Sequence, residues 1–400
     1  MERIRTVGDD LTKLSEQSGD QAEHAAHSRF RWINGAPQAT IVVCAGVPTD
    51  QLGRPRASLT FASPWSGPGG VAGLALAALF LGCFMKSESY DPLRLSAAAA
   101  VQTLDLVVRD DVRQRVIPML VYLPAGTKPA AVVLFSHGLG GSRAGSSYLG
   151  EHWAARGYVA VFLQHPGSDE SVWRDEPPAN VLAALSRAAT GENLLLRVQD
   201  VAAVLDQLAR WNEETGHALS GRLDLERVGM AGHSFGAMTT QAVSGQSFPA
   251  APNLKPHPQI RAAVIMSPSA PAQGDAATAF SSVAMPWMLM TGTRDVAPIG
   301  ADLAARFEVY PYLPDSIDKY ELVLYEGQHY AFTDRALVGS DTARDPNHHR
   351  VILALSTAFW DAYLLQDRGA LAWLQGAGPR SVLAKDDGWR FFAGSAPDNK

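Results

Sequence analysis

The sequence predicts an α/β fold built on a mostly parallel, eight-stranded sheet with helices on both faces. Two observations support this prediction. From residue 100 onward, short apolar segments alternate with segments of helical period, and this alternation is typical of a parallel sheet covered on both sides. The same region contains no internal repeat and no low-complexity tract, so a repeat architecture is not indicated.

Eight apolar segments have the length of strands, and two longer segments have the period of helices. The strands are expected at residues 103–109, 116–123, 130–136, 158–164, 227–231, 261–266, 287–291 and 320–325, the first two as an antiparallel pair. A helix at 194–211 carries apolar residues at helical spacing, namely Leu194, Val198, Val201, Leu205 and Leu208. A last amphipathic helix is expected at 350–365.

The composition narrows the class of protein. The 400 residues are 46% hydrophobic and 18% charged, with a formal net charge of -6. These values are ordinary for a soluble globular protein and lack the basic excess that binding to a phosphate backbone requires, so we expect no nucleic-acid partner. The only cysteines are Cys44 and Cys83, so the rest of the chain must be stabilised by packing rather than by disulfides.

The first 84 residues differ from the remainder, because Gly, Pro, Ser and polar residues dominate and no regular period persists. We expect residues 1–84 to be poorly ordered and residues 85–400 to form the folded domain. Within the first segment, residues 71–82 form an uncharged run that is shorter than the 20 or so residues of a membrane-spanning helix. We therefore expect no integral membrane span in the mature domain.

Two interpretations of this run remain open. In the first, residues 71–82 are the apolar region of a signal peptide, preceded by Arg54 and Arg56 and followed by Cys83 in a degenerate lipoprotein cleavage box. Export to the periplasm or envelope would follow. In the second, translation starts at Met85 and the product stays in the cytoplasm.

A G-x-S-x-G motif lies between the expected strand at 227–231 and a segment of helical character. It comprises Gly232, Ser234 and Gly236. A nucleophile at the tip of a tight strand-to-helix turn adopts strained backbone angles, and glycines on both sides remove the side chains that would collide there. The turn also directs the hydroxyl toward a helix N-terminus, which favours developing negative charge. Ser234 is therefore the candidate nucleophile.

A second glycine-rich turn follows the strand at 130–136 with the sequence HGLGGS. Glycines allow the backbone amides of such a loop to turn inward, so the N–H of Leu139 can converge with the N–H of Phe235 on one oxygen atom. These two residues are the candidate oxyanion hole. We assign His137 to holding the loop by hydrogen bonds rather than to proton transfer.

The base and its orienting acid should follow the nucleophile in chain order, with the base after a late strand. His329 lies in the loop after the strand at 320–325, and Asp295 ends the apolar run at 287–291. An imidazole that accepts the serine proton needs a carboxylate on its other nitrogen. The competing carboxylates are Asp315, Asp318 and Asp334, the last of which could instead fix the loop of His329.

These motifs resemble the α/β-hydrolase superfamily, and within it bacterial esterases similar to platelet-activating-factor acetylhydrolase and dienelactone hydrolase. The resemblance covers about residues 87–390. It is carried by LFSHGLGGSR at 134–143, LQHPGSDESVW at 163–173, GHSFGAMTTQ at 232–241 and the GTRD that ends at Asp295. It implies a triad of Ser234, Asp295 and His329. Dienelactone hydrolases proper use a cysteine nucleophile, so the serine at position 234 does not imply that activity.

The loops above the site indicate the size of the substrate. They are too short for a large cap domain, and His165, Trp173 and Tyr330 lie on them at positions that could line an apolar acyl pocket. We expect small to medium esters, with an acetyl or short acyl group. Hydrolysis of amides, peptides or thioesters, or ligand binding without turnover, are the alternatives.

No cofactor or metal is expected at this site. His348 and His349 are adjacent, but no third zinc ligand lies near them in the sequence, so we assign them a capping or surface role. The sequence does not determine the oligomeric state.

Overall fold

A computed structural model describes residues 90–95, 100–272, 274–334 and 345–395. The segment 1–84, with its apolar run and both cysteines, lies outside the described residues. The described strands are β1 (Gln102–Asp110), β2 (Arg115–Leu123), β3 (Ala130–Ser136), β4 (Val159–Leu163), β5 (Leu223–His233), β6 (Ile260–Met266), β7 (Trp287–Arg294), β8 (Lys319–Gln328) and β9 (Gly388–Phe392).

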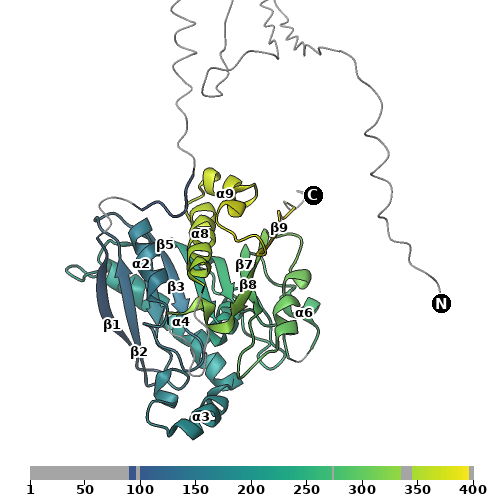
Figure 1. The fold of residues 1–400 in the computed structure, drawn as a ribbon. Coiled ribbons are helices and arrows are strands. Elements are labelled where there is room, and N and C mark those ends of the chain that lie inside the picture. The colour runs from purple at the N-terminus through teal and green to yellow at the C-terminus, as the bar shows by residue number, and fades with distance from the viewer. Residues whose placement is uncertain (1–89, 96–99, 273, 335–344, 396–400) are drawn as a thin grey trace, which may run out of the picture. The chain divides into compact units, whose positions relative to one another are not determined.

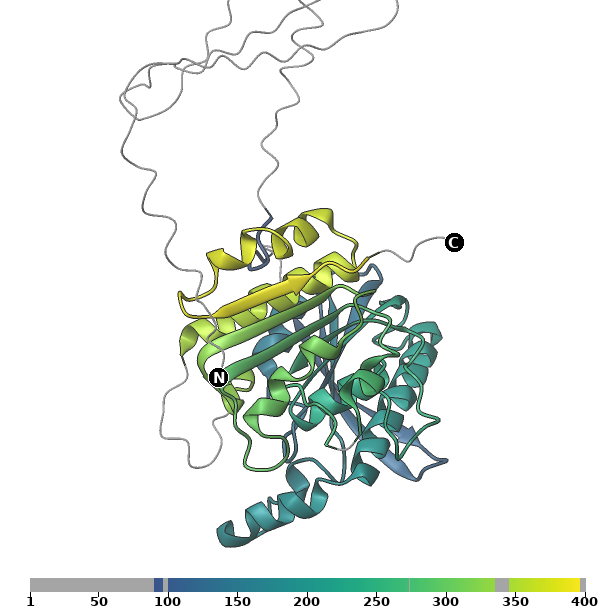
Figure 2. The same cartoon turned by 90° about the vertical axis from the view of Figure 1, so that its right-hand side faces the viewer.

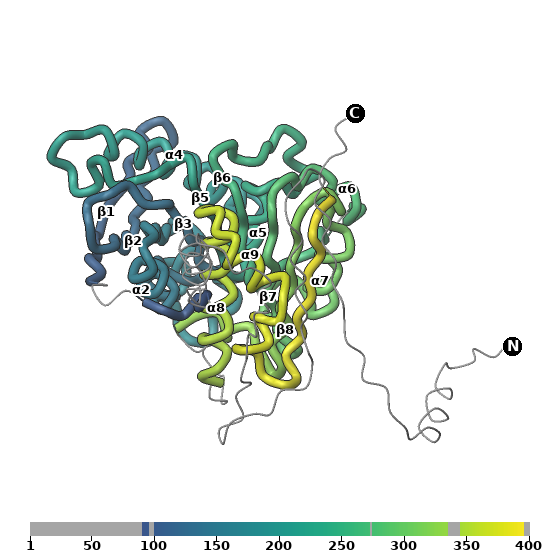
Figure 3. Tube along the Cα trace, turned by 90° about the horizontal axis from the view of Figure 1, so that it is seen from above, coloured from purple at the N-terminus to yellow at the C-terminus, as the bar shows by residue number. Residues whose placement is uncertain are grey.

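All of these strands form one sheet in the order β1-β2-β4-β3-β5-β6-β7-β8-β9. The five pairings from β4 across to β8 are parallel, whereas β1 with β2, β2 with β4, and β8 with β9 are antiparallel. Figure 3, which looks from above, follows the sheet from β1 on the left to β8 on the right. Because neighbouring parallel strands end at the same edge, the loops that follow β3, β5, β6, β7 and β8 meet there.

Helices cover both faces of the sheet, as the sequence predicts (Figures 1 and 2). The longer ones are α2 (Ser147–Arg156), α4 (Gly191–Glu213), α5 (Phe235–Val243) and α8 (Pro346–Tyr363), and the shorter ones are α3 (Val181–Ala188), α6 (Ala276–Phe280), α7 (Leu303–Phe307) and α9 (Arg368–Leu374). One core joins the sheet to α2 and α8, and a second joins it to α4 and α5.

Strand β3 contributes side chains to both cores. Val133 and Phe135 pack with α2 and α8, whereas Val132 and Leu134 pack with α4. The alternation follows from the two-residue period of a strand, and all four side chains are buried because both faces are covered.

Within the described residues, the sheet has one strand more than the eight expected. Strand β9 pairs with β8 in antiparallel register, with Phe391 opposite Tyr320. The sequence analysis missed it because its five residues are all partly or fully exposed and form no buried apolar run. An antiparallel edge strand on a parallel sheet is common in such folds.

The region between β4 and α4 includes helix α3, which is drawn at the bottom of Figure 1, far from α9 at the top. It contains the 3₁₀ turns η1 (Glu170–Val172) and η2 (Pro178–Asn180) and the eight-residue helix α3. Across the described residues, no helix combines the length and apolar character needed to cross a membrane.

Candidate active site

The carboxyl edge of the parallel strands brings together the predicted site residues. Ser234 follows β5, Asp295 follows β7, and His329 follows β8 at the start of the 3₁₀ turn η4 (His329–Phe332). The three residues are far apart in the sequence but follow strands on the same side of the sheet, where β7 and β8 are neighbours and β6 alone separates β5 from β7.

Ser234 occupies a strained turn between strand β5 and helix α5. Its φ and ψ are 58° and −117°, a combination that is rare for a residue with a side chain. A Cβ added at Gly232 would lie 2.2 Å from the carbonyl oxygen of Gly236, and one added at Gly236 would lie 1.9 Å from that of Ser136. Only glycine fits at these two positions, so the motif is a steric requirement of the turn.

Ser234, His329 and Asp295 form a continuous chain of hydrogen bonds. The Ser234 hydroxyl lies 2.9 Å from Nε2 of His329, and Nδ1 of His329 lies 2.6 Å from Oδ1 of Asp295. Ser234 is partly exposed, whereas His329 is 6% exposed and Asp295 is fully buried. Ser234 is thus partly open to solvent, while the two groups behind it are shielded from water.

Asp295 is held in its ionised form. Burial by itself raises the pKa of this carboxyl, but the hydrogen bond from His329 and the nearby charge of Arg306 outweigh it and lower the pKa to about 2. The second carboxylate oxygen accepts a hydrogen bond from the Thr291 hydroxyl at 2.9 Å. Both oxygens are therefore engaged, which fixes the carboxylate relative to the imidazole.

A second histidine supports the ring of His329. The His233 ring lies 4.7 Å from it, centroid to centroid, and also contacts Phe332. Burial and then the nearby His329 hold the pKa of His233 well below its usual range. His233 therefore stays neutral at pH 7 and adds no competing positive charge beside His329.

The competing carboxylates lie in other interactions. Asp315 pairs with Lys319 at 2.8 Å, and Asp318 accepts a hydrogen bond from the Tyr363 hydroxyl at 2.5 Å. Asp334 accepts hydrogen bonds from the backbone N–H and the hydroxyl of Ser147. It thereby fixes the loop after His329 against α2.

Leu139 and Phe235 line the same pocket as Ser234. Phe235 is the first residue of α5, so its backbone N–H has no acceptor within the helix. The loop of Leu139 is closed by a hydrogen bond from the Gly141 N–H to the Gly138 carbonyl at 3.0 Å. As expected, His137 helps to hold this loop, since its Nε2 accepts the N–H of His165 at 3.1 Å.

The pocket beside Ser234 has a volume of about 210 Å³. Its lining residues come from the glycine-rich loop, the junction of α3 and α4, the nucleophile turn and α5, the loop after β6, and the segment from β7 to α7. The lining residues are Leu139, Ala189, Thr190, Gly191, Leu194, Ser234, Phe235, Met238, Ser269, Ile299, Gly300, Ala301 and Arg306.

The three residues predicted to line the acyl pocket do not line it. His165 is fully buried, with Nδ1 3.0 Å from Asp200 and Nε2 2.9 Å from the Ser136 hydroxyl. Trp173 donates its indole N–H to the Gly140 carbonyl at 2.7 Å and so packs behind the glycine-rich loop. Tyr330 is 5% exposed and is not among the lining residues. The sequence placed these residues on loops at the carboxyl edge of the sheet, but it did not indicate in which direction each side chain points.

Two buried arginines near the site were not among the residues predicted from the sequence. Arg306 lines the pocket and donates from Nη1 to the carbonyls of Ser267 and Pro268, at 3.0 and 2.8 Å. Arg197 is fully buried on the face of α4 that packs on the sheet. Together with Asp200, it interrupts the apolar stripe of that helix. Two charged residues on a buried stripe were the available signal.

The adjacent histidines of α8 have structural partners. His348 donates from Nε2 to the Tyr325 carbonyl at 3.0 Å, and His349 stacks on Tyr148 at 3.7 Å between ring centroids. In the part of the chain that the structure describes, no group of three or more His, Cys, Asp or Glu side chains is arranged to hold a metal ion.

The chain is similar to a known protein family and to several curated proteins. The model of the PET hydrolase-like family matches residues 119–341, a range that contains Ser234, Asp295 and His329. Similar curated proteins include Cutinase 2 of Thermobifida cellulosilytica and Cutinase cut1 of Thermobifida fusca, each 24% identical over 212 residues, or 53% of this chain. The match spans 64% of the first relative and 53% of the second.

Proposed function

Because this chain belongs to the PET hydrolase-like family, an α/β-hydrolase family, we propose that it is a serine hydrolase of carboxylic esters. The observation that supports this most directly is the hydrogen-bonded chain from Asp295 through His329 to Ser234, which is partly open to solvent. Ester cleavage through an acyl-enzyme requires this order of groups.

In the proposed first step, Ser234 Oγ attacks the ester carbonyl carbon and His329 Nε2 takes the hydroxyl proton. The imidazolium that forms is stabilised by the Asp295 carboxylate. The carbonyl oxygen becomes an oxyanion, which we assign to the N–H groups of Leu139 and Phe235. Collapse of this intermediate breaks the bond to the alcohol, and His329 returns the proton to the leaving oxygen.

In the second step, water cleaves the acyl-enzyme. His329 removes a proton from the water as its oxygen attacks the acyl carbon, and the same two N–H groups would hold the second oxyanion. His329 then returns that proton to Ser234 Oγ as the bond from Oγ to the acyl carbon breaks, which releases the carboxylic acid and restores the serine hydroxyl.

We infer an apolar acyl group of small to medium size as the substrate feature. Leu194, Met238 and Ile299 supply apolar surface to the pocket, and its volume suits a short chain. The matched relatives are named cutinases, which is consistent with ester chemistry. The preference for an acetyl group that the sequence suggests stays a prediction.

The test is a panel of p-nitrophenyl esters from acetate to dodecanoate, with matched amide and thioester substrates. We predict turnover of the shorter esters, and a loss of at least about a thousandfold in kcat for Ser234→Ala with an unchanged melting temperature, because the hydroxyl serves chemistry rather than packing. Equal rates on amides would favour the amidase alternative. No turnover of any ester by the wild type would contradict the proposal.

A further inference from the structure

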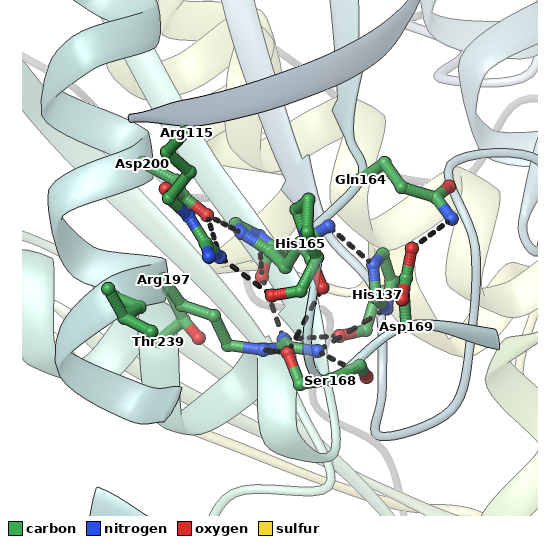
Figure 4. Close-up of polar contacts among 12 residues, drawn as sticks. Arg115, His137, Gln164, His165, Ser168, Asp169, Arg197, Asp200 and Thr239 are labelled. Atoms are coloured by element: carbon green, nitrogen blue, oxygen red, sulfur yellow. Dashed lines mark hydrogen bonds and ion pairs between the residues drawn. The ribbon is translucent and has the colours of Figure 1, made fainter. Parts of the chain in front are cut away.

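A fully buried arginine lies directly behind the glycine-rich loop and the nucleophile turn. Arg197 belongs to α4, and its guanidinium is surrounded by β3, the loop after β4 and the start of α5 (Figure 4). Burying a cation is costly unless hydrogen bonds and opposite charge compensate it. The contacts of Arg197 therefore indicate what it holds in place.

Arg197 fixes the backbone on both sides of Leu139. Nη1 donates to the His137 carbonyl at 2.7 Å, two residues before Leu139. Nε donates to the Ser168 hydroxyl at 2.8 Å, and the carbonyl of the same serine accepts the N–H of Gly140, one residue after Leu139, at 2.9 Å. The loop that presents the Leu139 N–H is thus held at both ends by one side chain and its partner.

The same guanidinium also contacts the residue that carries the other proposed oxyanion donor. The Arg197 guanidinium carbon lies 4.5 Å from the centroid of the Phe235 ring, which is within the range of a cation–π contact. Arg197 therefore contacts the Leu139 loop through backbone hydrogen bonds and Phe235 through its side-chain ring.

A second polar network, built on the buried carboxylate of Asp200, lies close enough to Arg197 for their charges to interact (Figure 4). Asp200, one turn along α4, accepts a hydrogen bond from Arg115 at 2.6 Å and contacts Nδ1 of His165 at 3.0 Å. The backbone N–H of His165 in turn donates a hydrogen bond to Nε2 of His137. This carboxylate offsets the charge of Arg197 and connects the loop to strand β2.

We propose that Arg197 is a positioning residue that holds the Leu139 and Phe235 N–H groups at the spacing required by the oxyanion. This proposal rests on the function proposed above. It assigns to Arg197 no contact with the substrate: its hydrogen bonds set the geometry of groups that do contact it. A displacement of about 1 Å in such groups can lower the rate by about a hundredfold.

The test compares Arg197→Met with the wild type on p-nitrophenyl butyrate. We expect kcat to fall by about 30- to 100-fold while KM changes by less than about threefold, since the acyl pocket is retained. The Ki of a trifluoromethyl ketone, which binds as a tetrahedral oxyanion, should rise in step with the loss of kcat/KM.

Arg156→Met is the matched control. Arg156 also bonds a buried carboxylate and backbone carbonyls, namely Asp361 at 2.7 Å and the carbonyl of Arg94 at 2.6 Å, but it lies on α2 away from Ser234. We expect it to lower the melting temperature and leave kcat and the ketone Ki unchanged. If Arg197→Met does not fold, Ser168→Ala replaces it, with a fall in kcat at constant KM as the supporting result.

The outcomes separate the two proposals. Wild-type activity that depends on Ser234, together with an Arg197→Met kcat within threefold of wild type, overturns the inference alone. Equal losses of kcat in Arg197→Met and Arg156→Met overturn it as well, because they indicate general destabilisation. A wild type without esterase activity overturns the proposed function and the inference with it.

Discussion

Asp295 is a fully buried carboxylate whose only described histidine partner is His329. With a pKa of about 2, it remains ionised at every pH above about 3, so its own titration does not limit activity near neutral pH. Its role in the proposed mechanism is to keep the Nδ1–H tautomer of His329 and to stabilise the imidazolium.

We predict that Asp295→Asn lowers kcat by about 10³- to 10⁴-fold, because the amide favours the wrong imidazole tautomer. The melting temperature and circular dichroism spectrum should stay close to those of the wild type, since Asn has the same shape. Asp334→Asn is the control, as that carboxylate fixes a loop and does not touch His329. Near wild-type turnover by Asp295→Asn would place the acid elsewhere.

Residue identities at the proposed triad could be predicted because each depends on a local signal. Ser234 lies between two glycines that only a tight turn explains, and chain order then selects Asp295 and His329. The pocket residues could not be predicted in this way. The direction of His165 is set by Asp200, which is 35 positions away, and no local pattern reports such a partner.

At the scale of elements, the junction between α3 and α4 forms one wall of the pocket. Gly191 is the first residue of α4, and a Cβ added there would meet no other atom within 4 Å. A larger side chain therefore fits without displacing the backbone, and Gly191 is one of the residues that line the pocket of Ser234.

We predict that Gly191→Phe shortens the acyl chains that the enzyme accepts. The kcat/KM for p-nitrophenyl octanoate should fall at least about tenfold relative to acetate, because each excluded methylene removes about 0.8 kcal/mol of apolar contact. Glu192→Phe is the matched control, since that neighbouring residue is exposed and does not line the pocket. An unchanged chain-length profile in Gly191→Phe would show that acyl chains bind elsewhere.

The elements themselves were predictable where burial creates a pattern. The eight expected strands all occur, and the helix expected at 194–211 lies within α4 (Gly191–Glu213). Strand β9 was not predictable, because its pairing with β8 depends on register with a strand about 70 residues earlier rather than on its own period.

Three buried histidines around the site make the stability of the whole fold depend on pH. Burial lowers the pKa of His137 and His233 well below the usual range and that of His165 to about 4. In the unfolded chain each titrates near pH 6.5. Their contribution to stability is therefore complete above about pH 6.5 and is lost as the pH falls toward the folded-state pKa values.

We predict that the free energy of unfolding falls below pH 6.5 by about 1.4 kcal/mol per pH unit for each of these histidines. Guanidinium titrations at pH 7.5, 6 and 5 measure this slope, and titrations from pH 7.5 to 9 are the control, since the three histidines stay neutral there in both states. Equal stability at pH 7.5 and pH 5 would contradict the burial of neutral histidines.

An acyl-enzyme on Ser234 is detectable by mass spectrometry of the protein quenched in acid during turnover of a p-nitrophenyl ester. We predict a mass increase equal to one acyl group, located on the peptide that contains Ser234 and absent in Ser234→Ala. Ester turnover in which acyl adducts form on a different residue, or persist unchanged in Ser234→Ala, would contradict it.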